Sequence, residues 1–363
     1  MGALDHSDMG TDWAVTDSLL FPSTKLKAVG VQLLRAAGVA EADAELVADS
    51  VVEANLRGVD SHGILNLAIY VDRVRRGLVE LHPTFPILNQ ASSTALIDGQ
   101  NSLGQVAAMR AMELAIAQAR SAGLALVGVR NTNHCGMMAY FTMRAAAQGL
   151  IGFASCNAPA SMAPWGSWEI LLGNNPVCFA IPAGQHQPIV LDMANSVVAK
   201  GKIYGAQSRK QRIPEGWALD NEGQPTTDPA AALDGGSLLP SGGPKGSGLA
   251  IVMDMLAGLM TGSGFGTEVG SLHHELSRGM KVGLLMGAMD VEGFMPLADF
   301  GRLADWYIER IQNSAPAAGN QRVYVPGELE FETRIRRSQE GIPLPSKVWE
   351  ELTSTAQKLG VQI

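Results

Sequence analysis

An acid, a hydroxyl and an imidazole occupy consecutive positions in this chain, at Asp60, Ser61 and His62, between Gly58 and Gly63. Histidine has an unperturbed pKa close to neutrality, so its side chain suits proton transfer at physiological pH. The competing interpretation is a helix N-cap made by the acid or the hydroxyl, with a bystander histidine. A cap does not require a glycine on both sides of the triplet, and these local features therefore favour a turn that carries chemistry.

A second histidine, His134, lies in the polar segment 130–136, which is expected to be a loop after an apolar strand. The segment precedes an expected helix, so its backbone N–H groups can face a ligand. The alternative is that Asn133 simply caps that helix, and the loop by itself supports both interpretations equally. Cys135 follows directly, but adjacent residues rarely reach the geometry of a Cys–His catalytic pair.

Lys245 lies in a glycine-rich segment, 241–248, directly before a strongly apolar helix candidate. Pro244 precedes the lysine and Gly246 follows it, so the segment is not a Walker A loop. Backbone N–H groups at a helix start, together with an ammonium group, favour an anion site; the alternative is a flexible loop with a solvated lysine. No GxGxxG sequence follows a predicted strand, so any dinucleotide site here is not of the Rossmann kind.

No metal site is predicted from the sequence. His273 and His274 are neighbours rather than four positions apart on a helix, which favours surface residues over metal ligands. Neither an HExxH sequence nor an EF-hand loop occurs. The residues alone thus indicate an acid–base enzyme that acts on an anionic ligand.

The elements that must position these residues fall into two groups. Helices are expected at 23–37, at 41–57 and through Tyr70 to Arg76, with the last two flanking the Ser61–His62 turn. From about residue 93 strands and helices alternate, which is typical of an α/β or α+β domain. Residues 157–176 are expected to form a long functional loop and 207–247 an irregular region. Strands are expected at 94–97, 124–129, 150–156, 177–181, 188–191 and 282–289, and helices at 103–121, 137–147, 249–261, 297–313 and from about 345.

Composition limits the class of protein. The chain has 363 residues, of which 46% are hydrophobic and 17% charged, as in a compact globular protein. A formal net charge of −8 and the lack of a basic run argue against nucleic acid and anionic membranes as partners. Three cysteines without CxxC spacing favour the reducing cytoplasm. No stretch reaches the ~18 apolar residues of a membrane span, and residues 1–20 are expected to form a flexible leader.

The order of motifs along the chain resembles the type 2 malate/L-lactate dehydrogenase family, whose members include ureidoglycolate dehydrogenase, sulfolactate dehydrogenase and diketogulonate reductase. The resemblance extends from about residue 25 to about residue 340. It is carried by the segments 57–63 (RGVDSHG), 133–134 (NH), 149–152 (GLIG), 163–166 (APWG), 173–176 (GNNP), 191–194 (LDMA), 213–218 (IPEGWA), 225–229 (PTTDP), 243–246 (GPKG) and 326–328 (PGE).

The resemblance implies an oxidoreductase that uses NAD or NADP to interconvert a small anionic 2-hydroxy acid and the 2-oxo acid, with histidine acid–base catalysis. It also implies a homodimer and a non-Rossmann, mixed-sheet NAD(P)-binding domain at 91–296. A smaller helical domain at 21–90 is expected to be completed by about 297–363.

The same resemblance assigns roles to individual residues. His62 and His134 match the two acid–base histidines, and Ser61 and Tyr70 match substrate-side positions; Ser61 is also a catalytic candidate. Positions that match or adjoin cofactor contacts are Ala158, Asn175, Asp192, Met193, Ala194, Lys245, Gly246, Pro326, Gly327 and Glu328.

One departure from the family pattern concerns the substrate. Asn66 stands four residues after His62, where the family usually has an arginine that clamps a carboxylate; asparagine cannot supply that charged, bidentate fork. Further departures at Ser167, Asn174 and Ser247 also bear on the substrate more than on the cofactor. Two alternatives therefore accompany the dehydrogenase: an NADPH-dependent cyclic imine (imino acid) reductase, and a nucleotide-binding relative without catalysis.

Overall fold

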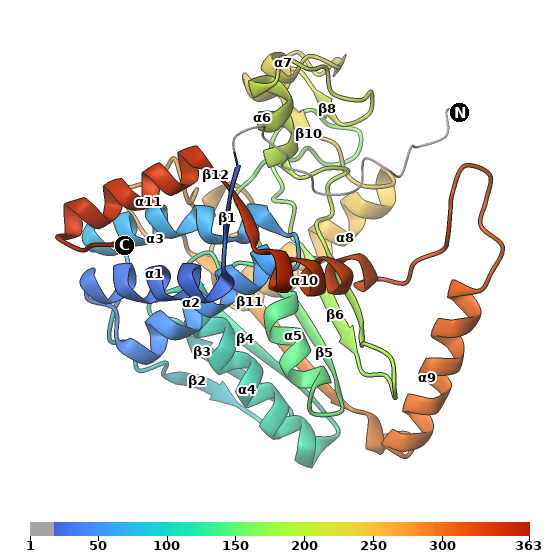
Figure 1. Ribbon diagram of the computed structural model, residues 1–363. Helices are drawn as coiled ribbons and strands as arrows, with labels where there is room; N and C mark the ends of the chain where they lie inside the picture. The colour runs from blue at the N-terminus through green and yellow to red at the C-terminus, as the bar shows by residue number, and fades with distance from the viewer. Residues whose placement is uncertain (1–17) are drawn as a thin grey trace.

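The computed structural model describes residues 18–363, and a seven-stranded sheet lies at its centre (Figure 1). The strand order is β2-β3-β4-β11-β5-β6-β7, in which β3 and β4 are parallel and the other neighbouring pairs are antiparallel. A Rossmann unit needs successive parallel strands, so this mixed sheet confirms the predicted α/β, non-Rossmann class. The strands are β2 Ile87–Gln90, β3 Thr94–Asp98, β4 Leu124–Thr132, β5 Leu150–Cys156, β6 Val177–Ile181, β7 Ile189–Met193 and β11 Val282–Asp290.

Two helices pack directly on this sheet. α4 (Gly104–Ala122) lies against β4 and β11, and α5 (Ala139–Ala146) lies against β5 and β6. Small side chains permit this close approach, since the α4 alanines that face the sheet are fully buried: Ala107, Ala108, Ala111, Ala115 and Ala119. α4 ends at Gly123, whose φ of 80° lets the chain turn at once into β4.

A helical unit lies beside the sheet and contains both ends of the described chain (Figure 1). It comprises α1 (Ser23–Ala36), α2 (Glu41–Leu56) and α3 (Leu67–Arg75), against which α10 (Glu328–Glu340) and α11 (Ser346–Leu359) pack. β1 (Ser18–Phe21) pairs antiparallel with β12 (Ile342–Pro345). The last residues of the predicted leader therefore belong to a strand, and residues 1–17 lie outside the described part.

α9 (Leu297–Gln312) stands apart from the helical unit, at the far edge of the sheet in Figure 1. Its Asp305 carboxylate accepts hydrogen bonds from the backbone N–H groups of Gly184, Gln185 and His186. These contacts attach α9 to the turn between β6 and β7 rather than to α1–α3.

A small subdomain lies at the top of Figure 1. It contains a three-stranded sheet of β8 (Ala218–Leu219), β9 (Pro225–Thr226) and β10 (Ser237–Leu238), with α6 (Lys200–Ser208) and α7 (Pro229–Leu233). α8 (Pro244–Asp254) follows it in the chain and contacts β5 of the large sheet. Most of the region predicted to be irregular, 207–247, lies outside helices and strands; the short elements within it were not predicted, because strands of two residues are too short to show alternation. α8 begins at Pro244 because proline fits the first turn of a helix, and it continues as a π-helical turn, Met255–Leu259.

Within residues 18–363, none of the helices combines the length and the apolar character needed to cross a membrane.

Candidate active site

The turn that carries the Ser-His pair is fixed by Asn55, near the end of α2. Asn55 Nδ2 donates to Asp60 Oδ1 at 2.5 Å, and Asn55 Oδ1 accepts from the Ile64 N–H at 2.7 Å. A Cβ on Gly63 would lie 2.3 Å from Asn55 Oδ1, so the second glycine of the motif is needed for this close approach.

Asp60 connects the turn to the C-terminal part of the chain. Its carboxylate accepts from two guanidinium nitrogens of Arg337 in α10, at 2.7 and 3.0 Å, and both side chains are buried. A buried bidentate pair of this kind fixes geometry as well as charge. Asp60 therefore holds the turn against α10 and does not cap a helix. Ser61 and His62 line the adjacent cavity.

The two candidate acid–base histidines lie together. The rings of His62 and His134 stack with centroids 5.5 Å apart and planes inclined by 22°. Ser61 Oγ is 3.0 Å from His62 Nδ1, and Tyr70 Oη is 2.6 Å from His134 Nδ1. Because each Nδ1 is already engaged, Nε2 of each ring is the nitrogen that remains for a ligand.

β4 carries His134 into this position. The strand continues to Thr132, so the loop predicted at 130–136 was wrong in its first three residues. Asn133 is buried, and its Nδ2 donates to the carbonyls of Asn101 and Ser102, both at 2.9 Å. Since α5 begins several residues later, Asn133 holds the backbone beside His134 and does not cap a helix.

Burial lowers the pKa of both imidazoles. For His134 burial is the main cause, the charges of His62 and His273 add to it, and its pKa falls to about 3. Burial lowers the pKa of His62 in the same direction and raises the pKa of Tyr70, whose phenol therefore stays protonated. At neutral pH both rings are uncharged, and an uncharged imidazole can accept a proton from a bound hydroxyl group.

Both histidines line one cavity of about 690 Å³, a size typical of small-molecule and cofactor sites. Tyr70 lies behind His134 and is buried. The other residues singled out from the sequence divide into two sets. Those that line the cavity are Asn66, Ala158, Asp192, Ala194, Pro326 and Gly327, and those that do not are Asn175, Met193, Lys245, Gly246 and Glu328.

Two residues of the second set support the cavity wall from behind. Asn175 is fully buried; its Oδ1 accepts from the Ala158 N–H and its Nδ2 donates to the Ala250 carbonyl, both at 3.0 Å. Glu328 Oε2 accepts from the Val325 N–H at 3.0 Å and so shapes the Pro-Gly turn. Lys245 is exposed in the first turn of α8, outside this cavity.

Asp192, at the end of β7, offers a carboxylate to the cavity. Its Oδ2 accepts from the Ala139 N–H at the start of α5, at 2.8 Å. The side chain is exposed to the cavity, but desolvation by the surrounding protein atoms raises its pKa to about 6, against the opposing effect of the N–H groups of Ala139 and Met138. Acidic side chains bind ribose hydroxyl groups at other dinucleotide sites, so a carboxylate here suits a nucleotide.

Arg57 is a cavity residue that the sequence analysis left without a role. Its side chain is 2% exposed, and none of its guanidinium nitrogens has a hydrogen-bond partner among the described residues. The guanidinium carbon lies 4.2 Å from the centroid of the Phe331 ring. Burial lowers the pKa of Arg57, and the negative charges of Glu53, Glu330 and Asp192 offset part of the cost of burying this cation.

A lysine, a histidine and a glutamate also line the cavity: Lys200, His273 and Glu330. His273 was interpreted from the sequence as a surface residue, and it is exposed, but it faces the cavity. These residues come from separate segments that share no motif, so the sequence offered no signal for them. Within the described residues, no group of three or more His, Cys, Asp or Glu side chains is arranged to hold a metal ion.

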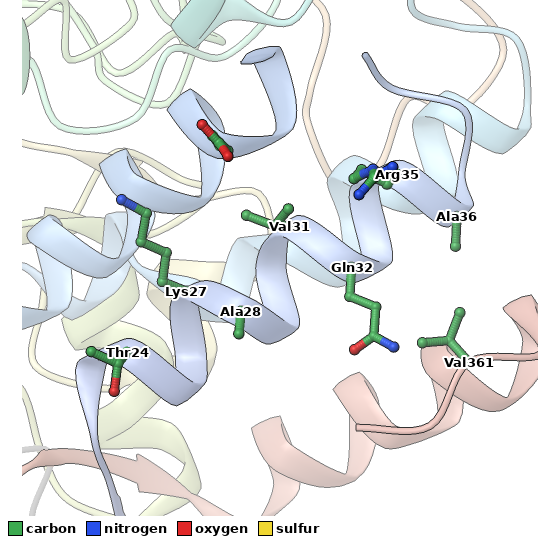
Figure 2. Close-up of a pocket in the computed structure, with 9 residues that line it drawn as sticks. Thr24, Lys27, Ala28, Val31, Gln32, Arg35, Ala36 and Val361 are labelled. Carbon is green, nitrogen blue, oxygen red and sulfur yellow. The ribbon is translucent and has the colours of Figure 1, made fainter. Parts of the chain in front are cut away.

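A second concave region follows the outer face of α1 and is bordered by Val361 (Figure 2). Its volume is about 720 Å³, but its two cations are already paired. Lys27 lies 2.6 Å from Asp49, and Arg35 lies 3.3 Å from Glu41. Its lining holds no histidine or cysteine, so the two-histidine cavity is the candidate active site.

Comparison with known proteins shows the family to which this chain belongs. Residues 21–353 match the sequence profile of a family described as malate/L-lactate dehydrogenase. The chain belongs to this family. This family member is 39% identical to a malate dehydrogenase from Pyrococcus horikoshii, over 94% of this chain and 96% of that protein. It is 35% identical to a ureidoglycolate dehydrogenase (NAD(+)) from Escherichia coli O157:H7, over 88% and 91%.

Solved structures in the malate/L-lactate dehydrogenase family share the fold. The sulfolactate dehydrogenase from Methanocaldococcus jannaschii superposes with a TM-score of 0.89 at 37% identity, covering 95% of this chain and 98% of that one. A Δ1-piperideine-2-carboxylate reductase from Pseudomonas syringae pvar. tomato gives 0.82 at 28% identity, covering 93% and 100%. The resemblance seen in the sequence is thereby confirmed.

Proposed function

We propose that this member of the malate/L-lactate dehydrogenase family is an NAD(P)-dependent dehydrogenase that interconverts a small 2-hydroxy acid and its 2-oxo acid. The observation that carries the proposal is the stacked pair His62 and His134, on the wall of a cavity that also holds Asp192 and Arg57. Relatives named as NAD(+)- and NADP(+)-dependent dehydrogenases support both cofactors.

The residues around the cavity fit such a cofactor. A nicotinamide, when bound, supplies the carbon that accepts or gives the hydride. Asp192 offers a carboxylate to ribose hydroxyl groups. Ala158, Ala194 and the Pro326–Gly327 turn complete the wall against which the cofactor would rest.

We assign the proton transfer to His134. When a hydroxyl group is oxidised its proton must leave, and Nε2 of the neutral ring can take it in the tautomer whose Nδ1–H donates to Tyr70 Oη. Tyr70 holds the ring through Nδ1 at 2.6 Å, so Nε2 keeps one orientation in both directions of the reaction. When the oxo group is reduced, the same nitrogen returns the proton to the substrate oxygen. His62, oriented by Ser61, is placed to hydrogen-bond the same oxygen.

The test combines cofactor binding with turnover. NADH and NADPH are each titrated by fluorescence, and their oxidation is then followed with a panel of 2-oxo acids that includes pyruvate and oxaloacetate. We expect at least one cofactor to bind and at least one 2-oxo acid to be reduced. Failure of both cofactors to bind would refute the proposal, and binding without turnover would favour a nucleotide-binding relative without catalysis.

A cyclic imine reductase is the second candidate. One solved relative is named as a Δ1-piperideine-2-carboxylate reductase, which supports this alternative. Oxidation of NADPH with a cyclic imino acid, without any oxidation with pyruvate or oxaloacetate, would select this candidate.

We predict that cofactor binding weakens at acidic pH through Asp192. Its carboxylate is ionised above the pKa of about 6, and protonation below that value removes the acceptor for ribose hydroxyl groups. The Kd of NADH or NADPH should be constant above pH ~7 and rise about tenfold per pH unit well below the pKa. Asp192→Asn should bind weakly throughout and lose this dependence. A Kd in the parent protein that does not change across this range would contradict the assignment.

We also propose that two copies form a homodimer through the apolar face of α8 and the π-helical turn. Large apolar side chains there are each at least 40% exposed: Ile251, Val252, Met255, Leu259 and Met260. An apolar patch of this extent marks a protein interface. Met255→Asp should convert a dimer to a monomer in sedimentation velocity, whereas Leu124→Asp, at an equally exposed apolar position on β4, should not. A monomeric parent protein would rule this interface out.

We place the protein in the cytoplasm. Cys135, Cys156 and Cys178 all carry free thiols, and Cys135 and Cys156 line the cavity beside His134. Free thiols in an active site are compatible with a reducing compartment, where disulfides are rare.

A further inference from the structure

A third imidazole reaches the active-site cavity from a distant part of the chain. His273 lies in the segment between the π-helical turn and β11, and it lines the cavity together with Ser271 and Leu272. Its side chain is exposed. Neither the proton transfer nor the binding of the cofactor, as described above, uses it.

One face of α3 fixes the position of this third imidazole relative to the other two. Asn66, Tyr70 and Arg73 are spaced by four and three residues, so they share one side of the helix. They are 2%, 3% and 1% exposed, respectively. Asn66 lines the cavity, Tyr70 is bonded to His134, and Arg73 binds the segment that carries His273.

Arg73 holds that segment by its backbone. Nη1 donates to the Glu275 carbonyl at 2.8 Å and to the Leu272 carbonyl at 3.4 Å, and Nη2 donates to the Arg278 carbonyl at 3.0 Å. A buried guanidinium that serves three carbonyls of one turn is a strong, charge-assisted support. Arg73 therefore fixes the backbone around His273 and makes no hydrogen bond to its imidazole, which lines the cavity.

The groups around His273 set its charge. Burial, His274 on its own segment and Arg73 on α3 lower its pKa, and Glu351 on α11 acts in the opposite direction. His134 also lines the cavity, and charge on His273 disfavours charge on His134. A carboxylate bound beside the ring would change this balance, because an opposite charge stabilises the imidazolium.

Lys200, another cation of the cavity wall, belongs to α6 in the small subdomain and not to the elements around α3. Asn66 is neutral, and the nitrogens of Arg57 are buried against other protein atoms. We propose that His273 binds the carboxylate of the substrate, in place of the arginine that the family usually has at the position of Asn66. This inference rests on the proposed dehydrogenase function, and it defines the substrate as an acid held by an imidazolium rather than by a guanidinium.

Steady-state kinetics with the most reactive 2-oxo acid test the proposal. His273→Gln retains a hydrogen-bonding side chain without the charge, and it should raise KM about 10- to 100-fold while kcat and the cofactor Kd stay unchanged. In the parent protein KM should rise with pH as the imidazole loses its proton. In His273→Arg, KM should stay low and independent of pH over the same range.

Proton uptake on binding of a substrate-like acid tests the proposal without turnover. Calorimetric titration of the protein–cofactor complex with oxalate, in buffers of different ionisation enthalpy, should show proton uptake in the parent protein and none in His273→Gln. His82→Gln, which replaces an exposed histidine outside the cavity, is the control and should behave as the parent.

The two proposals fail in different ways. Suppose that the parent protein reduces a 2-oxo acid and that its KM and proton uptake equal those of His273→Gln. This result would overturn the role of His273 and leave the dehydrogenase function intact. A parent protein that binds neither cofactor nor 2-oxo acid would overturn both.

Discussion

Replacement of His134 by glutamine is expected to lower kcat by about 10²- to 10⁴-fold, the range that a positioned acid–base group contributes. The reason is that Nε2 of His134 is the nitrogen left to exchange a proton with the substrate oxygen, since Nδ1 is held by Tyr70 at 2.6 Å. Glutamine fills similar space but cannot carry the proton. Turnover is followed by the oxidation of NADH or NADPH, and the cofactor Kd is measured by fluorescence.

Two further variants show whether His134 or its neighbour carries the proton. Tyr70→Phe removes the bond to Nδ1 and should lower kcat by less than His134→Gln, because the imidazole remains but is less well oriented. His62→Gln should also lower kcat by less than His134→Gln. If His62→Gln abolishes turnover while His134→Gln costs only a few-fold, the roles of the two histidines are the reverse of those assigned here.

The second large effect concerns stability. Arg337→Met should lower the free energy of unfolding by about 3–5 kcal/mol, because it leaves the Asp60 carboxylate buried without its partner. The pair is joined at 2.7 and 3.0 Å, and its side chains are only 4% and 10% exposed. Urea denaturation followed by circular dichroism measures the loss.

A surface pair provides the matched control. Arg302 and Asp299 lie 3.2 Å apart with side chains 72% and 54% exposed, so Arg302→Met should change the free energy of unfolding by only about 0–1 kcal/mol. The double variant Asp60→Asn/Arg337→Met should recover part of the loss, since no unpaired charge remains. If Arg337→Met and Arg302→Met have the same free energy of unfolding, the buried pair does not stabilise the turn.

The central strands could be predicted from the sequence because their signals are local. Leu150–Cys156 and Val177–Ile181 are apolar runs between turn residues, and the structure has strands with these same bounds. β1 and β12 were missed because each is short and has its partner at the other end of the chain. α10 was missed for a different reason: it is rich in Glu and Arg and buries only Arg337, so it shows no apolar periodicity.

Site residues, like strands, could be predicted only where their signal in the sequence was local. His62 and His134 could be proposed because each lies in a short polar segment next to a recognisable element, and the family resemblance linked the two. Their contact across 5.5 Å, and the partners Ser61 and Tyr70, needed the structure. His273 and Arg57 carry no local pattern that separates them from surface or structural residues, since what places them is the packing of distant segments. Lys245 is the opposite case: its glycine-rich segment is easily recognised in the sequence, but the residue lies outside the cavity.

The central claim is that hydride passes between the nicotinamide and the substrate at the His62–His134 site. Following the transferred hydrogen with deuterium tests this claim most directly. The protein is incubated with a 2-oxo acid substrate and NADH or NADPH that carries deuterium at the reactive C4 position, and the product is analysed by mass spectrometry and NMR. We predict one deuterium at C2 of the 2-hydroxy acid, and loss of this product in His134→Gln. Formation of the 2-hydroxy acid without deuterium at C2, or an undiminished rate in His134→Gln, would contradict hydride transfer at this two-histidine site.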